Sequence, residues 1–274
     1  MKKALTQIVY GQKNKIAANL AAVKKWGYEG FELLMTDKTD LNLGATAADY
    51  KRLRAASKKT GVRFTSICIS GTGKFTLFDD DAKVRESRKA EIRKGIEAAA
   101  ALGIDTILIV PGGATDKIQY DIAYDRVIAE LKTLAPAAEK ARVNLALEPV
   151  WNKLFVSPLD MRNAIDAVGS ERIGCFFDVA NFLFWSFPQH WIRILGGKRI
   201  KKIHFKDFKA ARQEGGEFNM VLSWPQLMDG QVNWPEVMKA IREIGYDDFV
   251  ISEVGGDDAT YAETSRRMDK ILAM

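Results

Sequence analysis

Short apolar runs alternate with longer amphipathic segments along the whole chain. The apolar runs are rich in β-branched and aromatic residues and are bounded by turn residues, a pattern typical of buried strands. We predict strands at residues 4–10, 27–37, 62–70, 105–113, 143–150, 172–179, 199–207 and 247–254. The segments between them have helical periodicity and predict helices at residues 14–26, 47–60, 82–102, 118–141, 158–168, 190–195, 233–245 and 257–272.

This alternation predicts the fold class. Because strands and helices follow one another without a linker, we expect residues 1–274 to form one α/β domain, a (β/α)8 TIM barrel. The alternative is a doubly wound open sheet, which would not bring the ends of the last four strands around one point. We expect residues 71–80 to form a loop and residues 208–231 to be irregular.

Composition and charge restrict the class of protein only a little. No apolar run approaches the roughly 18 residues of a membrane span, and the N-terminal apolar run is too short for a secretory signal. Cys68 and Cys175 have no metal-binding or redox spacing, so we expect reduced core thiols in a cytoplasmic protein. The net charge of +6 could reflect attraction to a phosphate or to a nucleic-acid partner. However, opposite charges alternate along the predicted helices, so we expect solvated helix faces and no nucleic-acid partner.

Four predicted strands carry polar side chains near their carboxyl ends. Asp178 ends the run IGCFF, and His204 lies inside KKIHF. Glu148 and Glu253 occupy the same place in NLALEPV and FVISEV. In a TIM barrel the carboxyl ends of the strands meet at one face, where the active site lies. We therefore expect these four side chains to converge.

The twofold periodicity of a strand supports this orientation. If Glu148 faces the barrel axis, Leu145 and Leu147 face the helices, as their apolar character requires. An inward His204 likewise sends Phe205 outward. By the same rule, Glu32 points to the side opposite from its strand neighbours.

The converging side chains predict a metal site. A buried carboxylate is costly to keep charged without a partner, and three of them in one place repel one another. A single divalent cation held by Glu148, Asp178, His204 and Glu253 removes that conflict. The donor set favours Mn²⁺, with Mg²⁺, Co²⁺ or Zn²⁺ as alternatives. Either glutamate taken alone could instead form a salt bridge inside the barrel.

The motifs LEPVWNK, FFDVAN, KKIHFKD, GQVNWPEV and ISEV together resemble the xylose-isomerase-like barrel superfamily. The similarity is to its sugar (phosphate) isomerase/epimerase branch, which includes ketose 3-epimerases, and it covers nearly the whole chain. The resemblance implies one divalent ion held by the four residues above, with Glu148 and Glu253 as the catalytic acid/base pair. Two positions depart from the ketohexose epimerases: Asn181 replaces a histidine, and Leu154 replaces a substrate-binding glutamate.

The implied chemistry is proton exchange on a ketose. One glutamate would remove the proton beside a carbonyl to give a cis-enediolate, and the other would return a proton from the opposite face. Aldose–ketose isomerisation uses the same intermediate, so the ligands do not separate it from epimerisation. A second interpretation is a lyase that dehydrates an inosose or a 3-keto sugar. A DNA-repair (AP-type) endonuclease of the same superfamily is disfavoured, because its multi-zinc site needs many histidines and this chain has 2.

Four further residues are predicted to contact a small carbohydrate substrate. Trp151 and Asn152 directly follow a ligand strand, Asn181 follows Asp178 by three positions, and Lys206 shares a strand face with His204. Trp151 could equally be packing, and Lys206 could form a salt bridge to a carboxylate. Aromatic residues between 182 and 191 predict a packed loop or a subunit contact, which leaves a homo-oligomer open.

Overall fold

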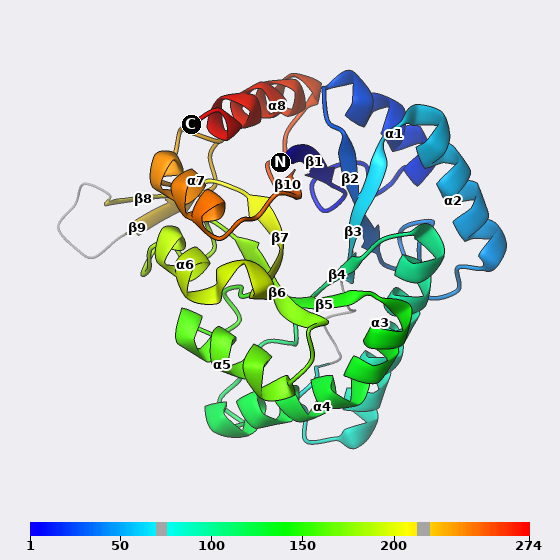
Figure 1. Ribbon diagram of the computed structural model, residues 1–274, viewed down its shortest axis with the longest axis vertical. Coiled ribbons are helices and arrows are strands. Elements are labelled where there is room, and N and C mark those ends of the chain that lie inside the picture. The colour runs from blue at the N-terminus through cyan, green and yellow to red at the C-terminus, as the bar shows by residue number, and fades with distance from the viewer. Residues whose placement is uncertain (70–75, 213–219) are drawn as a thin grey trace.

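A closed barrel of parallel strands forms the centre of the molecule (Figure 1). The computed structural model describes residues 1–69, 76–212 and 220–274. The strands are hydrogen-bonded in the order β1-β10-β7-β6-β5-β4-β3-β2, and β2 pairs with β1 to close the barrel. They are β1 (Lys2–Thr6), β2 (Gly30–Met35), β3 (Arg63–Ile69), β4 (Thr106–Ile109), β5 (Asn144–Leu147), β6 (Ile173–Asp178), β7 (Ile200–Phe205) and β10 (Phe249–Ser252).

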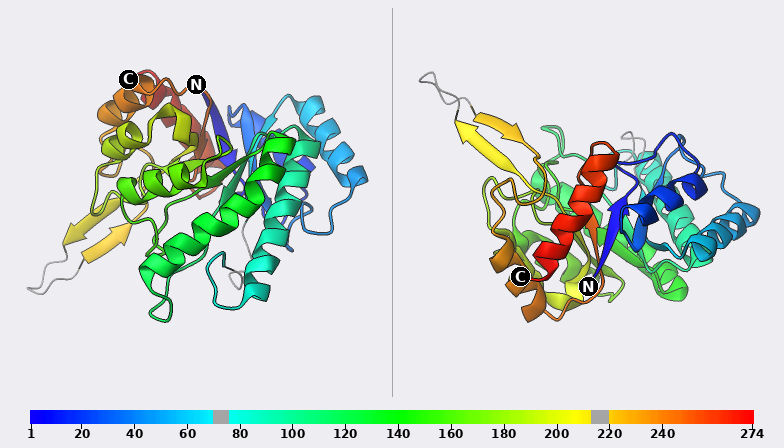
Figure 2. Two further views of the ribbon diagram at one scale, coloured as in Figure 1. Left: turned by 60° about the horizontal axis from the view of Figure 1, so that its bottom comes forward. Right: turned by 90° about the horizontal axis from the view of Figure 1, so that it is seen from above.

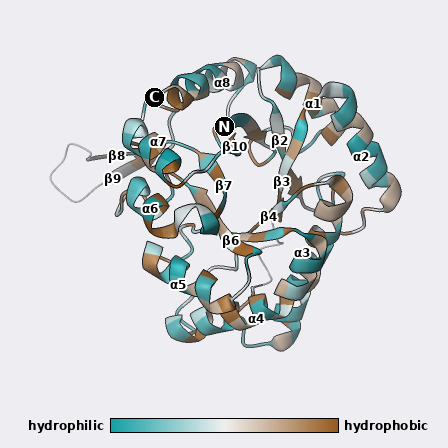
Figure 3. Cartoon of the chain, in the orientation of Figure 1, coloured by the Kyte–Doolittle hydropathy of each residue, from teal (hydrophilic) through white to brown (hydrophobic). Residues whose placement is uncertain are grey.

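Helices surround the barrel as an outer ring, so the predicted TIM barrel is confirmed and the open sheet is wrong. They are α1 (Ile16–Lys25), α2 (Ala47–Thr60), α3 (Ala82–Leu102), α4 (Tyr120–Ala141), α5 (Pro158–Val168), α6 (Pro188–Arg199), α7 (Trp234–Glu243) and α8 (Asp258–Leu272). Figure 3 shows hydrophilic residues on the outer side of this ring. None of the helices in the described ranges is long and apolar enough to cross a bilayer.

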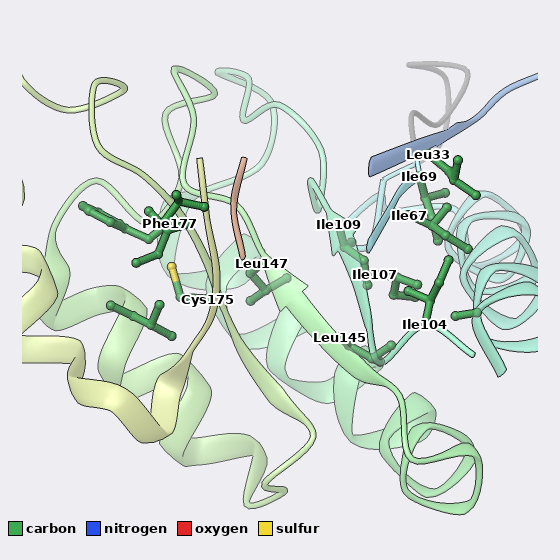
Figure 4. Packing of buried hydrophobic residues seen from close by; sticks show 14 of the residues in the cluster. Leu33, Ile67, Ile69, Ile104, Ile107, Ile109, Leu145, Leu147, Cys175 and Phe177 are labelled. Atoms are coloured by element: carbon green, nitrogen blue, oxygen red, sulfur yellow. The ribbon is translucent and has the colours of Figure 1, made fainter. Parts of the chain in front are cut away.

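Alternating strand residues build two separate apolar layers. Outward-facing side chains such as Ile107 and Leu145 pack against the helices (Figure 4). Inward-facing side chains such as Leu108, Ala146 and Phe176 form a second cluster inside the barrel. The predicted orientations are confirmed: the outer layer contains Phe31, Leu33, Leu145, Leu147 and Phe205. Both cysteines are free and buried, as predicted.

A buried lysine lies among the inward-facing positions at the amino-terminal end of the barrel. Lys202 is two residues before His204 and therefore shares its face of β7. Its ammonium group forms ion pairs with Asp105, at 3.1 Å, and with Asp248. Asp105 and Asp248 directly precede β4 and β10, so these pairs lie at the end of the barrel opposite to the carboxyl ends of the strands.

The stretch expected to be irregular contains a hairpin. β8 (Lys209–Arg212) and β9 (Met220–Ser223) pair in antiparallel fashion, and Figure 2 shows the hairpin extending away from the barrel. The prediction for residues 208–231 is wrong here because strands as short as KAAR have little β-propensity or alternation of their own. Half of the expected loop at 71–80 lies outside the described residues, since only 76–80 are described.

Asp207 joins two of the sequence motifs. It ends KKIHFKD and is fully buried. Its Oδ1 accepts hydrogen bonds from the backbone N–H groups of Phe208 (2.9 Å) and Val232 (3.2 Å). Its Oδ2 accepts from the backbone of Met228 (2.9 Å) and Gly230 (3.3 Å) and from the indole of Trp234 (3.2 Å). GQVNWPEV is therefore folded around this carboxylate, directly behind the end of β7.

Replacing Asp207 with Asn is expected to destabilise the fold by about 3 kcal/mol, because an amide NH2 would face N–H donors that have lost a charged acceptor. Urea unfolding measures the difference. Asp229→Asn is the matched control, because Asp229 lies in the same loop but is half exposed and pairs with Arg267; its effect should stay below about 1 kcal/mol. Equal stabilities of D207N and the wild type would contradict this account of the loop.

Candidate metal centre and active site

The four predicted ligands come together at the carboxyl ends of neighbouring strands. Asp178 ends β6, His204 lies in β7, and Glu148 and Glu253 directly follow β5 and β10. One donor atom from each lies within 4.8 Å of the others. His204 Nδ1 is 3.6 Å from Glu148 Oε1 and 3.3 Å from Glu253 Oε2. Residues 148 and 253, far apart in the sequence, thus contribute carboxylates to one small volume.

Two buried side-chain atoms that could bind a metal ion have no hydrogen-bond partner among the described residues. Asp178 Oδ1 accepts from the backbone N–H groups of Ala180 (2.7 Å) and Asn181 (2.9 Å), whereas its Oδ2 is unpaired. His204 Nδ1 is likewise unpaired. Unpaired buried polar atoms are rare in folded proteins and call for an explanation. One carboxylate oxygen and one imidazole nitrogen, both buried beside two further carboxylates, fit the ligand requirements of a divalent cation.

The electrostatics of the group favour bound positive charge, whether as protons or as a cation. Burial raises the pKa of Asp178 to about 6, with the negative charge of Glu253 adding to the shift. Burial also raises the pKa of Glu148, against the opposing influence of the nearby His204 imidazole. Burial would lower the pKa of His204, but Glu32, Glu148 and Glu253 raise it well above its usual value. For Glu253, the nearby His204 imidazole and the charge of Lys206 outweigh burial and lower the pKa.

Three of the predicted substrate residues contact this group or one another. Asn181 Nδ2 donates to Glu148 Oε1 at 3.3 Å. Lys206 Nζ donates to Glu253 Oε1 at 3.2 Å. This is the salt bridge to a carboxylate that the sequence left open as an alternative role for Lys206. The Trp151 indole donates to the carbonyl of Asn181, while its side chain is 41% exposed. These contacts place Asn181 and Lys206 on the two glutamates and Trp151 on the rim.

Asn152 lies on the wall of a cavity of about 640 Å³. Its Nδ2 donates to the carbonyl of Gly112 at 2.7 Å. Of the four clustered residues, Glu148 reaches the cavity lining, which also includes apolar side chains from the barrel interior such as Leu34 and Leu108. The cavity and the four-residue group therefore adjoin at Glu148.

The aromatic residues after β6 divide into two sets. Phe182 and Trp191 are buried, with ring centroids 4.8 Å apart, so packing explains them. Trp185 is half exposed, and its ring centroid lies 5.3 Å from that of Trp151. The ring centroid of Trp151 is also 5.8 Å from that of Trp224, which follows β9. The rim beside the centre is therefore aromatic and partly open to solvent.

Glu32 has no role predicted from the sequence, although the structure connects it directly to the centre. Glu32 is fully buried, and its Oε1 lies 2.9 Å from His204 Nε2. The available signal was the same as for Asp178, a carboxylate in the otherwise apolar run GFELLM. What the sequence could not supply was the opposing partner, because β1 and β10 separate β2 from β7 in the barrel.

The sequence matches the family described as xylose isomerase-like TIM barrel over residues 20–271. The chain belongs to this family. A curated relative is the L-ribulose-5-phosphate 3-epimerase UlaE of Salmonella paratyphi A, 25% identical over 269 residues, covering 93% of this chain and 88% of the relative. The fold is similar to that of a D-psicose 3-epimerase solved with D-fructose, with a TM-score of 0.79, 19% identity and full coverage of both chains. It is also similar to the IolI protein solved with a zinc atom, with a TM-score of 0.80, 18% identity and coverage of 100% and 98%.

Membership in the xylose isomerase-like family agrees with the resemblance seen in the sequence motifs. The curated relative is an epimerase, and epimerases are isomerases, so the prediction of an isomerase is confirmed at that level. The roles of individual residues, the identity of the metal and the location in the cell stay predictions.

Proposed function

We propose that this protein is a divalent-metal-dependent epimerase or isomerase of a ketose or ketose phosphate. The observation that carries the proposal is the position of two glutamates beside one imidazole nitrogen, with Glu148 Oε1 and Glu253 Oε2 at 3.6 Å and 3.3 Å from His204 Nδ1. Proton exchange at a carbon needs one group to remove a proton and another to return it. Two carboxylates from strands β5 and β10 can supply both functions.

Glu148, Asp178, His204 and Glu253 would hold the ion, and the unpaired Asp178 Oδ2 and His204 Nδ1 support this assignment. A bound divalent ion would act as a Lewis acid that stabilises negative charge on a carbonyl oxygen. The donor set of three carboxylates and one imidazole favours Mn²⁺ over Zn²⁺, with Mg²⁺ and Co²⁺ as alternatives.

Each proposed catalytic carboxylate is oriented by a neighbouring donor. Lys206 donates to Glu253 Oε1 and helps to keep that carboxylate ionised. Asn181 donates to Glu148 Oε1, in a position where the ketohexose epimerases carry histidine. With each carboxylate held in one orientation, Glu253 can take the proton from the substrate carbon and Glu148 can return one from the opposite face, or the reverse.

The cavity beside Glu148 suits a small polyhydroxylated substrate. Its lining combines apolar side chains with the amide of Asn152 and the charged groups of Arg88 and Glu91. Such a wall can accept hydroxyl hydrogen bonds while excluding water from the carbon centre. The relative's substrate, L-ribulose 5-phosphate, belongs to this chemical class. We keep a cytoplasmic location and the lack of a nucleic-acid partner as predictions.

Proton exchange with solvent tests the proposal. The Mn²⁺-loaded protein is incubated in D₂O with a panel of ketoses and ketose phosphates, and each sugar is examined by NMR after the metal has been removed. We expect deuterium at one carbon beside the carbonyl, together with the epimer or the aldose. Loss of water in place of a stereochemical change would support the lyase interpretation, and no exchange with any of the sugars would contradict the proposed function.

A further inference from the structure

A buried carboxylate on the far side of the barrel holds the imidazole of the proposed metal centre. Glu32 lies on the inward face of β2, and His204 lies on the inward face of β7. Strands β1 and β10 separate these two strands in the barrel (Figure 1). The 2.9 Å contact between Glu32 Oε1 and His204 Nε2 therefore spans the barrel interior, where both side chains are fully buried.

Hydrogen bonds from two neighbouring strands fix the position of the Glu32 carboxylate. Thr6 Oγ1 donates to Oε1 at 2.6 Å, and Ser66 Oγ donates to Oε2 at 2.6 Å. Thr6 Oγ1 itself accepts from the backbone N–H of Ile8 at 3.2 Å, which leaves its own proton free for Glu32. Both carboxylate oxygens are thus engaged as acceptors, and the group has little freedom to rotate away from His204.

This arrangement determines which imidazole nitrogen carries the proton. A carboxylate accepts hydrogen bonds but cannot donate them, so His204 Nε2 must donate to Glu32. In a neutral imidazole the lone pair then lies on Nδ1. Nδ1 is the nitrogen that faces Glu148 and Glu253 and has no hydrogen-bond partner among the described residues.

Packing restricts the ring from another direction. The ring of Phe176 lies 4.5 Å from the imidazole, centroid to centroid, at an interplanar angle of 59°. Phe176 belongs to the apolar cluster inside the barrel, together with Leu34 and Cys68. A carboxylate buried beside such side chains costs free energy that an apolar residue would avoid. A role for Glu32 in the centre explains its presence better than packing does.

We infer that Glu32 is a positioning residue that sets the tautomer and orientation of His204, so that the Nδ1 lone pair points at the cation site. The inference rests on the proposed function, because it assigns Nδ1 a metal to bind. Glu32 itself is not one of the four clustered residues, since it contacts Nε2, whereas Glu148 and Glu253 lie beside Nδ1. Carboxylates that orient a ligating histidine in this way typically change metal affinity by 10–100-fold when replaced.

Nitrogen NMR of the histidines tests the inference directly. The chain has 2 histidines, so a protein labelled with ¹⁵N-histidine and carrying His190→Gln shows the signals of His204 alone. In the Zn²⁺-loaded protein we expect a proton on Nε2 and none on Nδ1. A proton on Nδ1 would overturn the inference, and this measurement does not depend on the folding of any Glu32 variant.

Metal titration of Glu32 variants gives a second, independent readout. Glu32→Gln keeps the size but can donate through its amide, and Glu32→Asp moves the acceptor back by one methylene; either is expected to weaken Mn²⁺ binding 10–100-fold by calorimetry. Glu130→Gln is the matched control, because Glu130 is also largely buried but pairs with Arg85 and Lys89 in the outer ring of helices; its Mn²⁺ affinity should stay within twofold of wild type. Wild-type affinity in the Glu32 variants would overturn the inference and leave the proposed function standing. A wild-type protein that binds no divalent ion would instead refute the proposed function.

Discussion

Replacing either Glu148 or Glu253 with Gln is expected to reduce turnover by about 10²–10⁴-fold or more, the usual contribution of a positioned acid or base. Glutamine has nearly the shape of glutamate and can still offer one oxygen, so part of the metal affinity should survive. It cannot accept or return a proton, so the exchange step fails. The measurement is kcat for each variant under saturating Mn²⁺, together with the rate of deuterium incorporation from D₂O.

Asymmetric results from the two variants would assign the roles. If Glu253 removes the proton in one direction and Glu148 in the other, each variant should block exchange of one epimer more than that of its partner. Glu263→Gln serves as the matched control, because Glu263 lies on α8 and pairs with Arg266 and Arg267 near the surface. Full activity in both E148Q and E253Q would show that the two glutamates are not the acid/base pair.

Removing divalent ions with a chelator is expected to abolish activity and to lower the unfolding temperature by about 5 °C. At a free ion concentration 100 times Kd, a ligand that binds only the folded protein stabilises it by about 2.7 kcal/mol, and 1 kcal/mol corresponds to roughly 2 °C or more in a chain of this size. Scanning calorimetry with and without chelator measures the shift, and Mn²⁺ should restore both properties. An active protein after exhaustive chelation would contradict metal dependence.

The affinity for Mn²⁺ should also decrease as the pH is lowered. Burial raises the pKa of Asp178 to about 6 and also raises that of Glu148. A protonated carboxyl group no longer offers a charged ligand, so Kd for Mn²⁺ should increase as the pH falls through the raised pKa values of these two carboxyl groups. Calorimetric titrations in buffers of different ionisation enthalpy would count the protons that the ion releases.

The barrel and the four-residue group could be predicted because their signals are local. A strand buried on both faces tolerates no isolated charge. Polar side chains such as Asp178 in FFDVAN and His204 in KKIHF can therefore be recognised as candidate site residues among apolar neighbours. The barrel rule then places their carboxyl ends at one face. Helices such as α2 and α3 begin and end at the predicted residues, because their glycine-bounded ends are set by the local chain.

Other features depend on contacts between distant segments and could not be read from one stretch of sequence. The role of Glu32 needs the closure of the barrel, since its partner is 172 positions away. From the sequence, Asp207 is only an acidic residue that follows a strand. Its role in holding the loop that contains Gly230 depends on a contact that the sequence does not indicate. The hairpin of β8 and β9 was missed because neither strand has a pattern of its own.

Anomalous diffraction from a crystal grown with Mn²⁺ tests the central claim, that four side chains from different strands hold one ion. We predict a single strong peak among Glu148, Asp178, His204 and Glu253, with ligand distances of roughly 2.0–2.3 Å and His204 bound through Nδ1. A peak outside this group, or no peak at a saturating concentration of Mn²⁺, would contradict the account.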